Sequence, residues 1–109
     1  MAYDAELAER VRDALALREN GSEREMFGGI GFMLNGNMAC GVLGEELIVR
    51  LAPDDAERAL AEPYTRPFDY TGRPMRGWIF VAAEGIDSDE ELAGWVDAGV
   101  DYAASLPPK

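Results

Sequence analysis

The sequence contains no histidine, a single cysteine and a single lysine among its 109 residues. Without histidine, the chain has no imidazole to act as a general base or to bind a metal ion. Cys40 alone forms neither an internal disulfide nor a thiolate zinc site, and the apolar run around it predicts a buried, unreactive thiol. The only lysine, Lys109, follows no glycine cluster, which excludes a Walker-type phosphate loop. We therefore expect a protein that is not an enzyme and that needs no metal or cofactor.

Long apolar runs are also missing, so no segment is expected to span a membrane. The first four residues have neither the basic nor the apolar region of a signal peptide. Both features predict a cytoplasmic protein.

Basic residues are few: the chain has 10 of them against 21 acidic residues, which gives a net charge of −11. Proteins bind nucleic acids mainly by neutralising phosphates with lysine and arginine. An acidic surface is repelled by phosphates and by anionic lipids unless its cations are clustered. Direct binding to nucleic acid or to a membrane surface is therefore not expected.

Hydrophobic residues make up 48% of the chain, which is enough to bury a core in one domain over residues 1–109. Apolar residues recur at helical spacing after Asp4 and predict a helix that Asp4 caps and that runs to about Glu19. Asn20–Gly21 supplies the residues that commonly end a helix.

Two further helices are predicted. Pro53 followed by acidic residues predicts a short helix to about Ala61. Ser88 and Glu91 form a capping box, which predicts a helix that continues to about Leu106.

An antiparallel meander is predicted between the first and second helices. Alternating apolar residues predict strands over Ile30–Leu34, Met38–Leu43 and Glu46–Leu51. Asn35–Gly36–Asn37 is a strong hairpin signal between the first two of these strands. A fourth strand, at Arg24–Phe27, can extend the meander.

Residues 63–77 contain three prolines and two glycines and predict a loop. Because a structureless loop of this length is uncommon, we favour a short strand within it at Phe68–Tyr70. Residues Arg76–Ala82 then predict a strand that is apolar on both faces, either central in the sheet or with one face at an interface. The order of elements predicts an α+β two-layer sandwich, with an antiparallel sheet and helices at the start, middle and end.

Two motifs look like ligand loops and have simpler explanations. The acidic run Asp87–Glu91 lacks the glycine and the closing glutamate of a calcium loop, and its acids match the start of a helix. The glycine cluster at Gly28, Gly29 and Gly31 precedes a strand rather than a helix, which predicts a bend or bulge with close backbone approach.

One stretch is locally basic, with Arg66, Arg73 and Arg76 placed among aromatic residues that include Trp78. Arg50 joins this group if its strand lies alongside. Arginines among aromatic rings can hold a carboxylate, a phosphate or an acidic segment of a partner. The alternative, which we favour, is that these arginines pair with surface carboxylates in weak ion pairs.

A second apolar face of the sheet is predicted from Met33, Ile48 and one side of residues 78–81. If all three helices lie on the other face, this face is an interface, because exposed apolar patches mark contact sites. The alternative is that a loop or a helix covers it.

Motifs spread over about residues 4–107 form one pattern: Met26–Gly29, Gly31–Phe32, Asn35–Ala39, Leu47–Arg50, Gly72–Trp78 and the closing helix with Trp95. This pattern resembles the N-terminal domain of the TfoX/Sxy family. The resemblance implies a fold like the secretion-chaperone-like two-layer sandwich. Full-length family members regulate bacterial competence genes and carry a second, C-terminal domain, and we expect this chain to be a stand-alone N-terminal domain without it. The resemblance implies no catalytic residues.

Three hypotheses follow for the function. The leading one is a non-enzymatic module that binds a protein partner and acts as an accessory regulator of transcription, with Arg50 and the stretch from Arg66 to Trp78 as its contact surface. The second is a binder of small anions or metabolites that uses the same arginines, which predicts a pocket with at least two of them. The third is a chaperone-like homodimer that holds a client segment, with a two-fold interface on the side of Met33 and Ile48.

Overall fold

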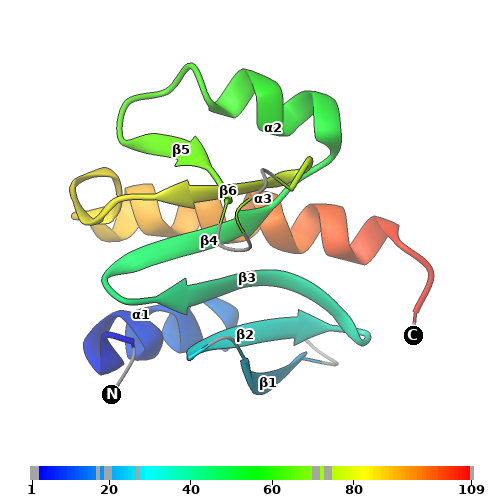
Figure 1. The fold of residues 1–109 in the computed structure, drawn as a ribbon. Coiled ribbons are helices and arrows are strands. Elements are labelled where there is room, and N and C mark those ends of the chain that lie inside the picture. The colour runs from blue at the N-terminus through cyan, green and yellow to red at the C-terminus, as the bar shows by residue number, and fades with distance from the viewer. Residues whose placement is uncertain are drawn as a thin grey trace.

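Six strands form one antiparallel sheet, in the order β1-β2-β3-β4-β6-β5 (Figure 1). The computed structural model describes residues 3–16, 18, 21–26, 28–69, 72 and 75–108. The strands are β1 (Gly21–Met26), β2 (Gly29–Leu34), β3 (Asn37–Leu43), β4 (Glu46–Arg50), β5 (Thr65–Pro67) and β6 (Trp78–Val81). The helices are α1 (Ala5–Leu15), α2 (Pro53–Ala59) and α3 (Asp89–Ser105), and the short 3₁₀ helix η1 is Ala83–Ile86. The predicted α+β sandwich is confirmed.

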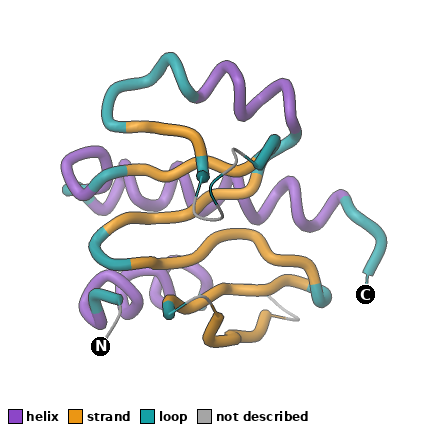
Figure 2. Tube along the Cα trace, viewed as in Figure 1, coloured by secondary structure: helices purple, strands orange, loops and turns teal. Residues whose placement is uncertain are grey.

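Helices α1 and α3 lie together behind the sheet, and α2 lies at its β5 end (Figures 1 and 2). All three helices were expected against one face of the sheet, and two of them, α1 and α3, lie there. In place of a third helix across the sheet, Ala56 of α2 adds a single buried side chain to the core.

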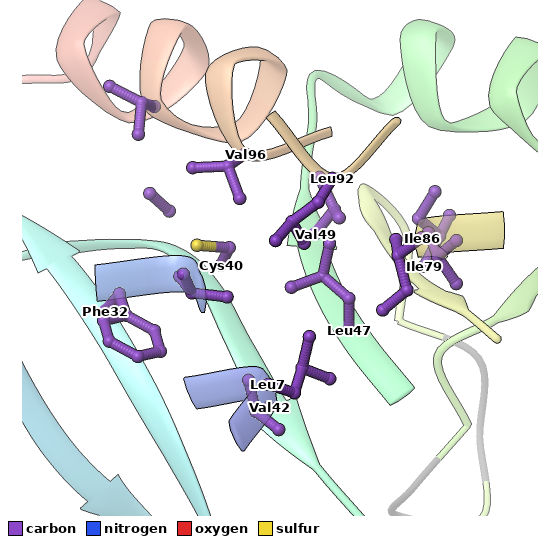
Figure 3. Packing of buried hydrophobic residues seen from close by; sticks show 14 of the residues in the cluster. Leu7, Phe32, Cys40, Val42, Leu47, Val49, Ile79, Ile86, Leu92 and Val96 are labelled. Atoms are coloured by element: carbon purple, nitrogen blue, oxygen red, sulfur yellow. The ribbon is translucent and has the colours of Figure 1, made fainter. Parts of the chain in front are cut away.

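The main core lies between the sheet and this helical layer. Alternate residues of the central strands point into it, such as Leu47 and Val49 from β4, and they meet Val96 of α3 and Leu7 of α1 (Figure 3). These aliphatic side chains are almost fully buried. Their burial provides the main driving force for folding.

The helix starts are fixed by local chemistry, as predicted. The Asp4 carboxylate accepts hydrogen bonds from the backbone N–H groups of Glu6 and Leu7, at 2.9 and 3.3 Å. At α3, Ser88 and Glu91 form the complete capping box. No helix in the described part of the chain is long and apolar enough to cross a membrane.

Helix α1 ends at Leu15, earlier than the predicted end at Glu19. The reason is that Gly21, which was predicted to follow the helix as its stop, already pairs with Leu34 as the first residue of β1. Glu19 and Asn20 lie outside the described residues.

The predicted meander is confirmed, and the fourth strand, predicted at Arg24–Phe27, is β1, which starts earlier, at Gly21, and pairs along the full length of β2. Phe27 lies outside the described residues. Asn35 and Gly36 both have positive φ, 52° and 82°, as a type I′ hairpin turn requires. The predicted close backbone approach occurs at Gly29, where a Cβ atom would lie 2.3 Å from the carbonyl oxygen of Val42. The bulge itself lies further on, between Phe32 and Met33.

The strand predicted at Phe68–Tyr70 is wrong in position, because β5 occupies Thr65–Pro67. Its early start follows from the end of α2: the Thr65 hydroxyl donates to the carbonyl oxygens of Ala59 and Glu62, at 3.0 and 2.9 Å. Phe68 directly follows β5, and its N–H donates to the carbonyl of Trp78 at 3.3 Å. Tyr70 lies outside the described residues.

Strand β6 starts at Trp78 rather than at Arg76, because Gly77 adopts a positive φ of 90° in a turn. The prediction of a central strand is confirmed, since β6 lies between β4 and β5. Its Ile79 and Val81 enter the main core, whereas Phe80 and Trp78 belong to a second cluster.

Candidate functional site

The face of the sheet away from α1 and α3, here called the outer face, carries a second set of apolar side chains. Ile48 and Phe80 are buried there with Phe68, and three more side chains pack partly buried against them: Met38, Leu43 and Trp78. These residues alternate along their strands with residues of the main core. The second apolar face predicted from the sequence is therefore present.

The outer face contains a cavity of about 310 Å³, here called the outer cavity. Its apolar lining includes Met33, Met38, Leu43, Ile48, Phe68, Met75 and Trp78, and Arg50 is the one charged residue among the described residues that line it. Pockets that hold ligands or anchoring side chains have this composition, with a mostly apolar wall and a few placed polar groups. The outer cavity is the candidate functional site.

Glycines leave room on the outer face beside this cavity. Gly31 and Gly41 stand opposite each other on β2 and β3, and both are buried. A Cβ atom on Gly41 would lie 2.8 Å from the methyl carbon of Met38 and 2.8 Å from the carbonyl oxygen of Ile30. The end of the Met38 side chain therefore lies in space that any other residue at position 41 would need.

Phe68 and Met75, which lie between β5 and β6, border one side of the outer cavity. The Phe68 ring packs against the rings of Phe80 and Trp78, with centroids 4.8 and 6.1 Å apart. The Met75 N–H donates to the carbonyl of Phe68 at 2.9 Å, and the Trp78 N–H donates to the carbonyl of Met75 at 3.1 Å. These bonds hold Met75 at the cavity with 39% of its surface exposed. A loop thus covers part of the outer face, as one of the alternatives predicted.

Arg50 is the polar group of the outer cavity. Its guanidinium carbon lies 5.1 Å from the centre of the Trp78 ring and 5.6 Å from that of the Tyr102 ring. Such contacts are cation–π interactions, which use the faces of the aromatic rings. Among the described residues, Arg50 forms no ion pair with a carboxylate. Its N–H donors therefore remain available to an anion.

The other predicted contact arginines behave differently. Arg66 forms an ion pair with Glu46, and its Nη1 atom lies 3.5 Å from Oδ1 of Asp69. The guanidinium carbon of Arg66 lies 4.2 Å from the centre of the Phe80 ring. Arg76 Nη2 lies 3.8 Å from Oδ1 of Asp54, and both side chains are largely exposed. These are the surface ion pairs of the favoured alternative. Arg73 lies outside the described residues.

Of the predicted arginines that the structure describes, only Arg50 lines the outer cavity, together with Trp78. The second hypothesis, a binder of small anions or metabolites, expected at least two of these arginines in one pocket. Met33 and Ile48, the predicted interface residues, both line the same cavity.

The sequence analysis covered Phe68 and Met75 only as part of the stretch from Arg66 to Trp78, and it did not point to Met38, which lines the cavity, or to Tyr102, which contacts Arg50. Met38 carried a usable signal, because it directly follows the hairpin turn on the strand that pairs with Met33. Tyr102 carried none, since its ring reaches Arg50 from α3, 52 positions along the chain.

Cys40 is fully buried in the main core, in agreement with its apolar sequence context. Burial raises the pKa of its thiol to about 12. The thiol is therefore protonated at neutral pH and is a poor nucleophile. Within the described residues, no three histidine, cysteine, aspartate or glutamate side chains gather in a way that could hold a metal ion.

The fold and the site define a small α+β two-layer domain with an apolar, arginine-bearing cavity on the outer face of its sheet. The family model of the TfoX N-terminal domain matches residues 13–103, and the chain belongs to this family. The resemblance predicted from the motifs is thereby confirmed. A search of curated proteins finds no match.

Proposed function

We propose that this domain is a non-enzymatic, cytoplasmic module that binds a partner protein through the outer face of its sheet. The observation that carries the proposal is the outer cavity, because an apolar recess on a surface is the usual seat of an anchoring side chain from a partner. Three of the five methionines, Met33, Met38 and Met75, line it. Methionine side chains are flexible and polarisable, and they are common at surfaces that recognise protein segments.

The role proposed for this binding is accessory regulation of transcription, in keeping with the resemblance to the full-length members of the family, which regulate bacterial competence genes. Contact with a regulatory protein, rather than with DNA, fits the net charge of −11. A chain with this charge repels phosphates over long distances and attracts a basic or neutral protein surface. The proposal assigns no chemistry to the domain, because its one thiol is buried and it contains no histidine.

A substitution that places a negative charge at the entrance of the outer cavity tests this function. Proteins recovered from host lysate with the tagged domain are purified, and their affinity is measured by calorimetry for the wild type and for Met75→Glu. We expect Met75→Glu to weaken a true partner by more than about tenfold, because a carboxylate then sits where an apolar anchor is desolvated. Met75 is 39% exposed, so the variant should fold.

Leu60→Glu is the matched control, because Leu60 is 36% exposed and lies at the end of α2, away from the cavity. Its affinity should equal that of the wild type. A partner whose affinity is unchanged by Met75→Glu would refute the use of the outer face.

A second candidate function is the chaperone-like homodimer, which is favoured by the position of Met33 and Ile48 in the same apolar cavity. The two candidate functions predict different masses in solution. For the homodimer, light scattering should give twice the 11.9 kDa of the monomer. Met75→Glu would then return the dimer to a monomer, and Leu60→Glu would not.

A further inference from the structure

Arg50 is distinguished from the other described arginines by what surrounds it. The ion pairs of the described residues use arginines that range from half-buried, such as Arg10, to exposed, such as Arg76. Arg50 is half-buried, touches two aromatic rings and has no carboxylate partner in the described chain, although acidic residues outnumber basic ones by 21 to 10.

The aromatic contacts leave the N–H donors along the edge of the Arg50 guanidinium without a partner among the described residues. Trp78 and Tyr102 meet the flat guanidinium at ring-centre distances of 5.1 and 5.6 Å. A guanidinium held in this way keeps a planar set of N–H donors that matches the two oxygens of a carboxylate. The aromatic contacts also restrict its rotamers, which lowers the entropy lost on binding.

The apolar lining next to Arg50 limits the size of what can accompany the carboxylate. At about 310 Å³, the outer cavity lies at the lower end of the range for small-molecule sites, roughly 300–1,000 Å³. This volume suits one large apolar side chain better than an extended cofactor. The flexible Met33, Met38 and Met75 side chains allow that side chain to vary in shape.

We propose that the outer cavity recognises a short segment of a partner protein in which a large apolar residue stands next to an acidic one. The apolar side chain enters the methionine-lined cavity, and the neighbouring carboxylate pairs with Arg50. This inference rests on the proposed function and specifies its partner chemistry. Because the whole domain carries a net charge of −11, the acidic residue must lie in a segment or protein that is otherwise neutral or basic.

The test uses two capped hexapeptides, Gly-Ser-Phe-Glu-Ser-Gly and the same peptide with Gln in place of Glu. Binding is followed by the NMR signals of the methionine methyl groups, since Met33, Met38 and Met75 report on the cavity directly. We expect the Glu peptide to shift these three signals and to bind about tenfold more tightly than the Gln peptide, as a charge-assisted bidentate pair predicts. Equal affinity of the two peptides, or no shift with either, would overturn the inference without any variant.

Variants then assign the preference to Arg50. In Arg50→Gln, the two peptides should bind equally, and Arg50→Lys should retain part of the preference because it keeps the charge but loses the planar donors. Arg24→Gln is the control: Arg24 is exposed on β1 and also forms no ion pair within the described chain, so its removal should leave the tenfold preference intact. A preference that persists in folded Arg50→Gln would overturn the assignment.

The two proposals fail separately. If the peptides bind as expected while the purified partner is insensitive to Met75→Glu, the chemistry of the cavity stands and its use by that partner is refuted. If the partner is lost on Met75→Glu while Glu and Gln peptides bind alike, the outer face is the interface and the acidic preference is refuted.

Discussion

At the scale of single residues, close packing depends on positions where no side chain fits. Gly99 of α3 faces the sheet, and a Cβ atom there would lie 2.4 Å from the carbonyl oxygen of Ala39. Gly94, on the same helix, has open space around it. The two glycines therefore have opposite roles in one element.

Replacing each glycine with alanine separates these roles. Gly99→Ala should destabilise the domain by about 1–3 kcal/mol, because the added methyl group forces α3 away from β3. Gly94→Ala should stabilise it by up to about 1 kcal/mol, since alanine favours the helix and restricts the unfolded chain. Urea unfolding measures both, and equal effects of the two substitutions would contradict the close contact of α3 with the sheet.

At the scale of elements, the parts that the sequence predicted well are those with local causes. The cap at Asp4, the capping box at Ser88 and the Asn35–Gly36 hairpin each need only a few neighbouring residues, and each is present in the structure. The end of α1 and the position of β5 depend on distant partners: Gly21 pairs with Leu34 of β2, and β5 pairs with β6. Such long-range competition cannot be detected from local pattern.

The capping box makes a prediction about α3. In Ser88→Ala, the Glu91 N–H loses its acceptor, so the domain should lose about 1 kcal/mol of stability. The free energy of unfolding in urea measures this loss. Ser105→Ala, at the exposed other end of the helix, is the control and should change stability by less than about 0.5 kcal/mol. A loss at Ser105 as large as that at Ser88 would contradict the role of the cap.

The site was predicted less completely than the fold. Alternation along the strands placed Met33 and Ile48 on one face with one side of residues 78–81, and the structure shows that this is the side of Trp78 and Phe80. The cavity also needs Phe68 and Met75, which reach it from the segment between β5 and β6, and its Arg50 contacts the Tyr102 ring of α3. No periodicity brings these residues together; only the tertiary fold does.

At the scale of the whole molecule, the net charge of −11 is spread over a body of about 31 × 29 × 27 Å. In 0.01 M salt the Debye length is about 30 Å, so charges repel one another across the whole protein, whereas in 0.15 M salt it is about 8 Å. Self-repulsion of this kind opposes the compact state.

Raising sodium chloride from 0.01 to 0.15 M at pH 7 should therefore raise the melting temperature, as followed by circular dichroism. The same change near pH 4.3, where the sequence has little net charge, should have much less effect. A melting temperature that falls with salt at pH 7 would show that the surface ion pairs outweigh the general repulsion.

The position of Arg50 between two aromatic rings has a consequence for communication through the domain. Trp78 belongs to the sheet and Tyr102 to α3, so one guanidinium touches both layers. An anion that pairs with this guanidinium therefore binds to a group that both layers hold in place. In this way the outer cavity on one face of the sheet is linked to the helical layer on the other face through a single side chain.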